Sequence, residues 1–447
     1  MLPPSSPTEP SSIFSEELAS QTASLAATAE PLASPFPGAA ADLRSALAVD
    51  VDALSPALRE LALALHRDPE TAFAENRAAG HITDLITASG LDAQVSAFGR
   101  ATAVTAEFTA GTGGRTVAFL AEYDALPDLG HACGHNIIAA TGVGGFLALH
   151  RLSQQRPDAF HGRVLLLGTP GEEGHSGKEY MAREGAFDGV DAALMLHPYG
   201  YDVADQVWLG RRTLTITFTG RAAHASSEPF MGRNALDAAT LFYTGLGLLR
   251  QQMIPVDRVH AVISDGGTRA SVIPERAVVQ AYVRSKFPET LVELSRRVDD
   301  LAHGAALMAG VGVEVVWDQH PASLPVRTND PLTRRWALAQ AERGRHALPL
   351  GVVSETLAAS TDFGNVSVRV PGIHPLLKIA PEGTALHTHA FAAAAASEFA
   401  LSGIADGAYG LAATALDFLV DDDLAAAVAD DFDAAGGVLD VERLFTD

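Results

Sequence analysis

Apolar and polar positions along the chain predict buried strands that alternate with helices. The segment RTVAFLAEYDALP, which begins at Arg115, is largely apolar until it ends abruptly in charges, as expected for a strand that leaves the core. RVLLLGTP and DAALMLHP have the same pattern, and NIIAATGVGGFLALHRL has helical spacing. We therefore predict an α/β fold in which a mostly parallel sheet is covered by helices on both faces.

The order of elements changes at about residue 208. From RTLTITFTG to VEVVWDQ, the segments are typical of strand, helix, strand, strand, helix and strand. This β-α-β-β-α-β order is that of the ferredoxin-like split unit. Because 447 residues exceed the size at which one core keeps growing, we expect two domains. An α+β domain at 208–323 is inserted into a larger domain made of 46–207 and 324–447.

The ends of the chain carry different patterns. Residues 1–45, rich in Ser, Pro and Ala, are expected to form a flexible extension. Ser55 followed by Pro56 predicts the N-cap and first turn of a helix. The acidic stretch 421–437 is expected to be a solvated end.

The charge and composition of the chain argue against some classes of binding partner and indicate its compartment. A formal charge of −23 repels polyanions, so we expect neither nucleic acid nor a membrane surface as a partner. No apolar run approaches the roughly 20 residues that span a bilayer. A single cysteine excludes an intrachain disulfide, and the first residues lack the apolar core of a signal peptide, which together predict a cytoplasmic protein.

Residues with metal-binding and acid–base chemistry follow the predicted strands at their carboxyl ends. Ligands bind at that edge in open parallel sheets, so these side chains are expected to meet in one crevice. The motif HACGHN lies in the loop after the first of these strands and can reach the same place. The side chains concerned are Asp124, Cys133, His135, Glu172, Glu173 and His197.

A thiol, imidazoles and carboxylates together form a ligand set that zinc prefers. The alternative for Cys133 is a buried free cysteine, but the flanking histidines and glycines favour a ligand. For His197 the alternative is a core histidine. In ALHTHAF, either His387 or His389 could complete the set.

The adjacent Glu172 and Glu173 in GTPGEEG cannot point the same way at the end of an extended strand, which favours a division of labour. One would bind metal, and the other would face substrate and water. A metal lowers the pKa of bound water toward about 7, and a nearby carboxylate can take its proton and pass it to a leaving amine. The pattern predicts a metal-dependent hydrolase, with two surface glutamates as the alternative.

Six motifs carry a resemblance to a known family: AEYDALP, HACGHN, GTPGEEG, LMLHP, GRAAHASSEPFMGRNALDAA and STDFGNVS, in that order. They resemble the zinc aminoacylase and carboxypeptidase family, metallopeptidase family twenty. Within it they are most similar to the cysteine-containing amidohydrolase branch, alongside aminobenzoyl-glutamate hydrolases and peptidases that act on dipeptides with basic residues. The likeness extends over roughly residues 50 to 420.

The resemblance implies two divalent ions per subunit, zinc or alternatively manganese. It also implies Glu172 as general base, Asp124 as a support for a metal ligand, and a homodimer formed through 208–323, in which His224 reaches the partner's active site. The implied metal ligands are Cys133, His135, Glu173, His197 and His387, and the implied substrate contacts are Asn234, Ser271 and Arg284.

Two positions depart from the family pattern. Ser271 stands where an Asn is common, and Glu122 stands where many members have a metal-binding His. The first departure puts one substrate contact in doubt, and the second fits the cysteine branch.

We expect the protein to cleave an amide or peptide bond in a small N-acyl amino acid, dipeptide or aminobenzoyl-glutamate-like compound. One alternative is a deacetylase or desuccinylase that acts on a biosynthetic amine. Another is an inactive homologue that binds metal or amino acids, although retention of Glu172 argues against it, because binding alone needs no base.

Overall fold

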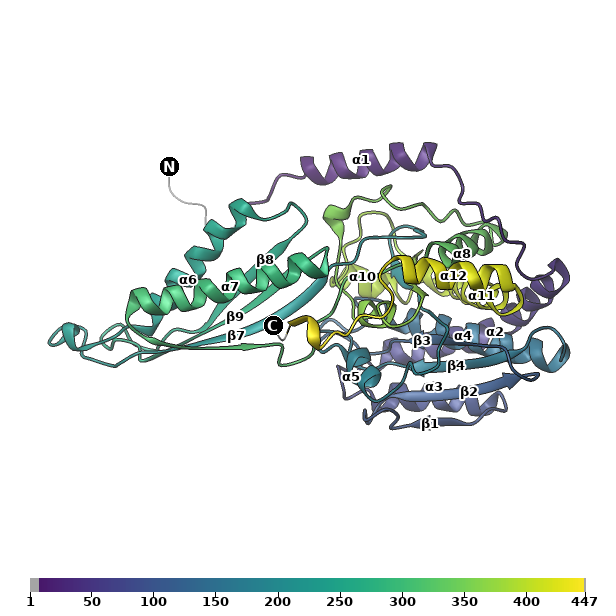
Figure 1. Ribbon diagram of the computed structural model, residues 1–447, viewed down its shortest axis with the longest axis horizontal. Coiled ribbons are helices and arrows are strands. Elements are labelled where there is room, and N and C mark those ends of the chain that lie inside the picture. Colours follow the sequence, from purple (N-terminus) through teal and green to yellow (C-terminus); the bar gives the residue numbers. More distant parts are fainter. Residues whose placement is uncertain (1–7, 446–447) are drawn as a thin grey trace.

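The computed structural model describes residues 8–445 and contains two main sheets (Figure 1). The larger sheet has six strands in the order β1-β2-β4-β3-β5-β11, and the smaller has four in the order β10-β7-β9-β8. The strands of the larger sheet are β1 (Ala93–Val95), β2 (Val104–Ala110), β3 (Arg115–Ala121), β4 (Gly162–Gly168), β5 (Ala192–Leu194) and β11 (Gly372–Ile373). A short pair, β6 (His197–Tyr199) and β12 (Leu376–Lys378), extends beyond it.

The larger sheet is parallel from β4 through β3 and β5 to β11, and helices cover both of its faces. Val117 and Phe119 of β3 belong to the core shared with one helical layer, whereas Ala118 and Leu120 belong to the core of the opposite face. The first layer contains α2 (Ala41–Arg67), α4 (His135–Gln155), α8 (Asp330–Glu342) and α11 (Glu398–Val420), and the second contains α5 (Gly177–Arg183) and α9 (Phe363–Ser367). These layers confirm the predicted fold class.

The position of the site follows from the strand order. β4 pairs with one side of β3 and β5 with the other, so the chain reverses its direction of travel across the sheet at β3. In open parallel sheets such a reversal leaves a crevice at the carboxyl ends of the strands. The segments that follow β3, β4 and β5 all begin at this edge.

The inserted part, residues 210–317, is β7 (Gly210–Thr219), α6 (Ala235–Leu249), β8 (Arg258–Asp265), β9 (Arg276–Ser285), α7 (Pro288–Ala309) and β10 (Gly312–Trp317). All its strand pairs are antiparallel. Leu214, Ile216 and Phe218 of β7 pack with α6 and α7 in a separate core. Alternation along the strand turns the residues between them to the other face, which these two helices leave open.

One predicted helix start is wrong. Helix α2 begins at Ala41, not near Ser55, and it contains Pro56 in its interior. Leu47, Val51 and Leu54 continue the apolar spacing towards the N-terminus and are buried. Burial of this longer stripe outweighs the hydrogen bond that Pro56 cannot donate.

The two ends contain more regular structure than expected. Within the expected extension 1–45, residues 1–7 lie outside the described part, Ile13–Thr28 forms α1, and Ala41 opens α2. The prediction of a solvated acidic end is also wrong, because Asp422–Ala434 forms α12, and its Leu424, Val428 and Phe432 are buried.

The antiparallel edge of the larger sheet was not predicted from the pattern. β1 and β2 add an antiparallel edge to the sheet, and α3 (Asn76–Ala88) and α10 (His389–Ala394) flank the main layers. Helix α11 is long and apolar enough to cross a membrane by length and composition alone. However, 83% of its most apolar window is buried inside the protein, where it packs on α4, α8 and α2.

Candidate metal centre and substrate cavity

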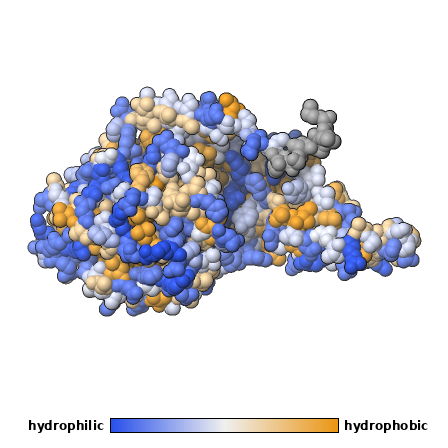
Figure 2. Space-filling model, turned by 180° about the vertical axis from the view of Figure 1, so that it is seen from behind, coloured by the Kyte–Doolittle hydropathy of each residue, from blue (hydrophilic) through white to orange (hydrophobic). Residues whose placement is uncertain are grey.

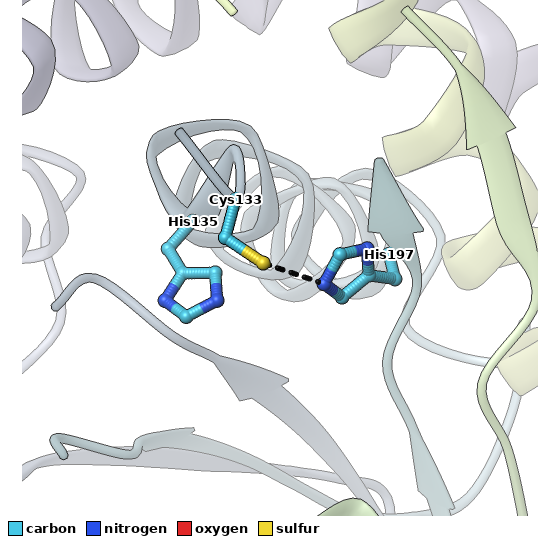
Figure 3. A group of neighbouring side chains, drawn as sticks. All are labelled: Cys133, His135 and His197. Carbon is cyan, nitrogen blue, oxygen red and sulfur yellow. Dashed lines mark hydrogen bonds between the residues drawn. The ribbon is translucent and has the colours of Figure 1, made fainter. Parts of the chain in front are cut away.

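A tight turn before α4 places Cys133 and His135 at the crevice. Gly134 between them has a left-handed φ of +79°, and a Cβ atom there would lie 2.9 Å from the Cβ of Pro198. Glycine is therefore required both for the backbone conformation and for the close approach. Figure 3 shows the resulting arrangement, in which the Cys133 sulfur points toward the His197 ring.

The Cys133 sulfur lies among three other predicted ligands. Its Sγ is 3.4 Å from His197 Nε2 and 3.4 Å from His387 Nε2. His387 Nε2 is in turn 3.4 Å from Glu173 Oε1. The backbone of His387 has a left-handed φ of +59° and its N–H donates to the Ala132 carbonyl, so this loop is held against the HACGHN turn.

Three overlapping groups of side chains can each hold a metal ion, with ligand atoms that lie within 4.8 Å of one another. The groups are Cys133, His135 and His197; Cys133, Glu173 and His387; and His135, Glu172 and Glu173. Because Cys133, His135 and Glu173 each belong to two groups, the arrangement suits two neighbouring ions. Two of the atoms concerned, His135 Nε2 and Glu173 Oε1, are buried without a hydrogen-bond partner among residues 8–445. Buried polar atoms are rarely left unpaired, so this observation favours a cation between them.

Asp124 forms hydrogen bonds with two of the candidate ligand residues, His135 and Glu173. Its Oδ1 accepts a hydrogen bond from His135 Nδ1 at 3.1 Å, and its Oδ2 accepts from the Glu173 backbone N–H at 2.9 Å. Although burial opposes it, the charge of Glu122 and the hydrogen bond to Asp124 raise the pKa of His135. A cation bound at Nε2 would displace the proton there, while Asp124 keeps the other proton on Nδ1. His197 has its Nε2 free, because its Nδ1 donates a hydrogen bond to the Pro198 carbonyl at 2.7 Å.

Burial sets the protonation of two ligands. It lowers the pKa of His197 to about 4, assisted by charge on neighbouring His135, so the ring is neutral and able to ligate. It raises the pKa of the Cys133 thiol, and the nearby charge of Glu173 adds to this effect. Metal binding needs a thiolate, so a thiolate at this position would need a cation to compensate its charge.

The two glutamates differ in their electrostatics. Burial, together with the charges of Glu173, Glu122 and Asp362, raises the pKa of Glu172 well above its usual value. Burial has the same tendency at Glu173, but the His387 imidazole, 3.4 Å away, and the charge of His135 outweigh it and lower the pKa. One carboxyl group therefore takes up a proton readily, while its neighbour stays ionised.

The sequence pattern did not identify a buried ion-pair network beside the cluster. Lys178 is fully buried, and its ammonium group contacts Glu122 Oε1 and lies 2.6 Å from Asp362 Oδ1. The other oxygen of Glu122 is 3.5 Å from His135 Nε2. Asp362 falls in the motif STDFGNVS and Glu122 in AEYDALP, so two members could have been found, whereas nothing in the sequence marked Lys178.

A cavity of about 760 Å³ opens over the cluster. Cys133, Glu172, Glu173, His197 and His387 line one side of it. The inserted part contributes the residues Arg211, Arg258, His260, Tyr282 and Arg284. The volume is typical of a small-molecule site. Of the expected substrate contacts, Arg284 is therefore at the cavity.

The other predicted residues of the inserted part lie elsewhere. His224, Asn234 and Ser271 do not line the cavity. Exposed His224 forms a bridge with Val272, so it lies beside Ser271, and Asn234 caps α6 by accepting from the Leu236 N–H. These residues are not brought to the metal cluster of their own chain.

Two further histidines of the motifs are also outside the three ligand groups. His131 is buried with Nε2 3.1 Å from the Leu65 carbonyl, and burial lowers its pKa to about 3. His389 opens α10, whereas His387 contacts Cys133 and Glu173.

Sequence comparisons place this geometry among known proteins. The model of peptidase family M20/M25/M40 matches residues 118–416. The Xaa-Arg dipeptidase of Mus musculus is 36% identical over 385 residues, which cover 84% of this chain and 89% of the mouse protein. A p-aminobenzoyl-glutamate hydrolase polypeptide of Escherichia coli (strain K12) is 31% identical over 425 residues, covering 80% of this chain and 88% of that protein.

Solved structures share the fold. A dinuclear metal-binding peptidase of family M20 from Bacillus subtilis has a TM-score of 0.61 at 20% identity, covering 82% of this chain and 99% of that chain. The aminobenzoyl-glutamate utilization protein from Klebsiella pneumoniae has a TM-score of 0.61 at 21% identity, covering 82% and 97%.

We expect Asp124→Asn to weaken zinc binding about 10- to 100-fold while leaving the fold intact. The amide cannot accept both hydrogen bonds with the same strength, so His135 would lose its fixed orientation. Competition titrations against a chelator measure the affinity, and circular dichroism measures the fold. Asp191→Asn is the matched control, because Asp191 accepts from the Thr116 N–H away from the cluster. Equal affinity in the two variants would contradict the assigned role.

Proposed function

The chain belongs to peptidase family M20/M25/M40, and we propose that it cleaves the amide bond of small N-acyl amino acids, dipeptides or aminobenzoyl-glutamate-like compounds in a metal-dependent reaction. The observation that carries the proposal is the sharing of Cys133, His135 and Glu173 between overlapping ligand groups under a cavity of small-molecule size. Relatives named for dipeptide and aminobenzoyl-glutamate hydrolysis support the substrate class.

We propose zinc as the metal, with two ions per subunit and manganese as the alternative. The sulfur of Cys133 supports zinc, because thiolate and imidazole ligands suit it better than hard cations. The proposed ligands are Cys133, His135, Glu173, His197 and His387. When bound, such ions lower the pKa of a coordinated water and polarise the substrate carbonyl.

Glu172 is the proposed general base. It lines the cavity, and its Oε2 lies 4.0 Å from His135 Nε2, so it is beside the ligands as well as the substrate. A carboxylate with a raised pKa can accept the proton of the attacking water and then hold it for the leaving amine. Glu173, whose pKa is lowered, stays available as an anionic ligand.

We also propose a homodimer in which His224 acts on the partner's cavity. Leu241, Tyr243 and Leu248 of α6 are exposed, and β8 is an edge strand with unpaired backbone groups. Apolar side chains are visible on the surface of the inserted part (Figure 2). An exposed apolar helix face beside a free strand edge is typical of an association surface.

We also propose the domain boundaries of the chain and its location in the cell. Domain limits at 46–207, 208–323 and 324–447 agree with a separate core between β7 and β10. A cytoplasmic location suits Cys133 as a ligand, since a reducing compartment keeps its thiol free.

The function is tested with a panel of dipeptides and N-acyl amino acids, scored by the released amine. Chelation should abolish hydrolysis and added zinc or manganese should restore it, because the proposed nucleophile is a water that only bound metal activates. Full activity in chelator, with less than one bound ion per chain, would disprove metal dependence. Acetylated and succinylated amines in the same panel distinguish the deacylase alternative.

Glu172→Gln should retain metal and lose about 10²- to 10⁴-fold in turnover, because the proton acceptor is gone. Glu173→Gln should instead weaken metal binding, because a ligand charge is lost. Metal analysis and steady-state kinetics on both variants separate the two roles, and each variant serves as the control for the other. Equal loss of metal would show that the roles are divided differently.

His224→Ala should lower turnover about 10²- to 10³-fold with metal content unchanged, as for loss of one donor to a developing oxyanion. Nδ1 of His224 accepts from the N–H groups of Ser226 and Ser227, which leaves its proton on Nε2 for such a contact. Mixing His224→Ala with Glu172→Gln under subunit exchange should restore part of the activity. A heterodimer has one site with an intact Glu172 and the partner's intact histidine. No recovery after proven exchange would rule out action across the dimer.

A further inference from the structure

Glu75 is a buried carboxylate that belongs to none of the three ligand groups. It directly precedes α3, and its side chain is fully buried. Its Oε1 accepts hydrogen bonds from the backbone N–H groups of Phe73 and Gly171, both at 2.9 Å, and its Oε2 accepts from the Thr102 hydroxyl at 2.7 Å. One side chain therefore joins three segments that are distant in sequence: the loop before α3, the loop before β2 and the GTPGEEG motif.

The bond to Gly171 fixes the backbone immediately before Glu172. Gly171 has a left-handed φ of +70°, and a Cβ atom there would lie 2.6 Å from the Phe73 ring. The Gly171 carbonyl accepts from the Gly177 N–H at 3.0 Å, so both polar backbone groups of this glycine are bonded. Since a buried backbone N–H needs an acceptor, the Glu75 oxygen determines where this turn can lie.

A second carboxylate fixes the backbone immediately after Glu172. The Glu173 N–H donates to Asp124 Oδ2 at 2.9 Å. Among residues 8–445, no hydrogen bond holds the Glu172 carboxylate itself, and its Oε2 lies 4.0 Å from His135 Nε2. The position of this carboxylate therefore depends on the backbone, which Glu75 and Asp124 hold on either side.

Glu75 also holds one wall of the cavity. Phe73 has a left-handed φ of +62°, which is uncommon for a residue other than glycine, and its N–H bond to Glu75 stabilises that conformation. Thr71 and Ala72, just before it, line the cavity, and the Phe73 ring meets the His175 ring with centroids 5.5 Å apart. The same carboxylate oxygen thus fixes this wall relative to the turn that carries the proposed base.

We propose that Glu75 is a positioning residue, which holds the turn that carries Glu172 so that the carboxylate of this base keeps its place beside the metal ligands. The inference rests on the proposed function, in which Glu172 is the base. Burial, with the charge of Asp124, raises the pKa of Glu75 to about 7. Both protonation states can accept hydrogen bonds at Oε1, so the turn needs an acceptor oxygen and not a negative charge.

The kinetic test compares Glu75→Gln with Glu75→Met in the metal-loaded enzyme, on the fastest substrate of the panel. Gln keeps an acceptor oxygen for both N–H groups and can donate to the Thr102 hydroxyl, so kcat should stay close to that of the wild type. Met is of similar length but has no oxygen. Its kcat should fall about 10²-fold, the loss that a displacement of about 1 Å can cause. Its KM and bound metal should not change, because Glu173 keeps its own bond to Asp124. Equal losses in the two variants would overturn the proposal, because charge would then be what matters.

Glu70→Met is the matched control. Glu70 lies in the same segment, and its Oε2 also accepts from two backbone N–H groups, those of Arg77 and Ala78, at 2.8 and 3.0 Å. These bonds hold the start of α3 and do not reach the GTPGEEG motif. This variant should leave kcat unchanged. A comparable fall in kcat would overturn the proposal, because general loosening of the segment would then explain the effect.

Hydrogen exchange follows the turn without relying on catalysis. Amide exchange in peptides that span residues 169–177 should be faster in Glu75→Met, but not in Glu75→Gln or Glu70→Met. A fall in kcat without faster exchange would overturn the proposal, because the effect would not pass through the turn. If Glu75→Met does not fold, Gly171→Ala tests the same contact, since its Cβ would displace the Phe73 ring. An unchanged kcat in Gly171→Ala would likewise overturn the proposal.

The two measurements also separate this inference from the proposed function. If the wild type cleaves no amide but exchange in 169–177 still depends on Glu75, the hold of Glu75 on the turn is supported and the proposed function is overturned. If Glu75→Met cleaves the substrate with the kcat of the wild type, the positioning role is overturned and the hydrolase stands.

Discussion

Four acidic side chains, Glu122, Asp124, Glu172 and Glu173, are held at the carboxyl ends of β3 and β4, where burial makes their charge costly. The negative charge of these carboxylates is compensated in three different ways. Asp124 accepts from His135 and a backbone N–H, and Glu122 is paired with buried Lys178. The remaining pair faces the thiol and the imidazoles, where the proposed divalent cations would supply the balancing charge. The rest of the site is arranged around this requirement.

The side chains of the candidate metal ligands are held in fixed positions by the backbone around them. A left-handed glycine turn, a left-handed His387 and a histidine tied to its own neighbouring carbonyl hold Cys133, His387 and His197 at 3.4 Å contacts. Ligands held in this way need little reorganisation when an ion binds. The cost is backbone strain at a non-glycine residue, which is common at functional sites.

The cavity is electrostatically asymmetric. Carboxylates and a potential thiolate lie on the side of the larger sheet, and Arg211, Arg258 and Arg284 lie on the side of the inserted sheet. In a protein of net charge −23, this local group of positive charges stands out from the rest of the chain.

The sequence alone determined the features that depend on short-range patterns: buried parallel strands, the β-α-β-β-α-β order of the inserted part, and the delivery of Asp124, Glu172 and His197 to one sheet edge. These follow because the carboxyl ends of parallel strands share an edge whatever the details of packing.

Only the tertiary structure decided which residues distant in sequence meet. Lys178 lies against Glu122 and Asp362, and Pro56 is tolerated inside α2 because one apolar stripe of the helix is buried. Arg211, Arg258 and Arg284 form a row only because β7, β9 and β8 pair in one register, and a shift of one residue would turn a strand's side chains to the opposite face. Such contacts depend on strand order, register and burial, which arise from the packing of the whole chain and leave no local signal in the sequence.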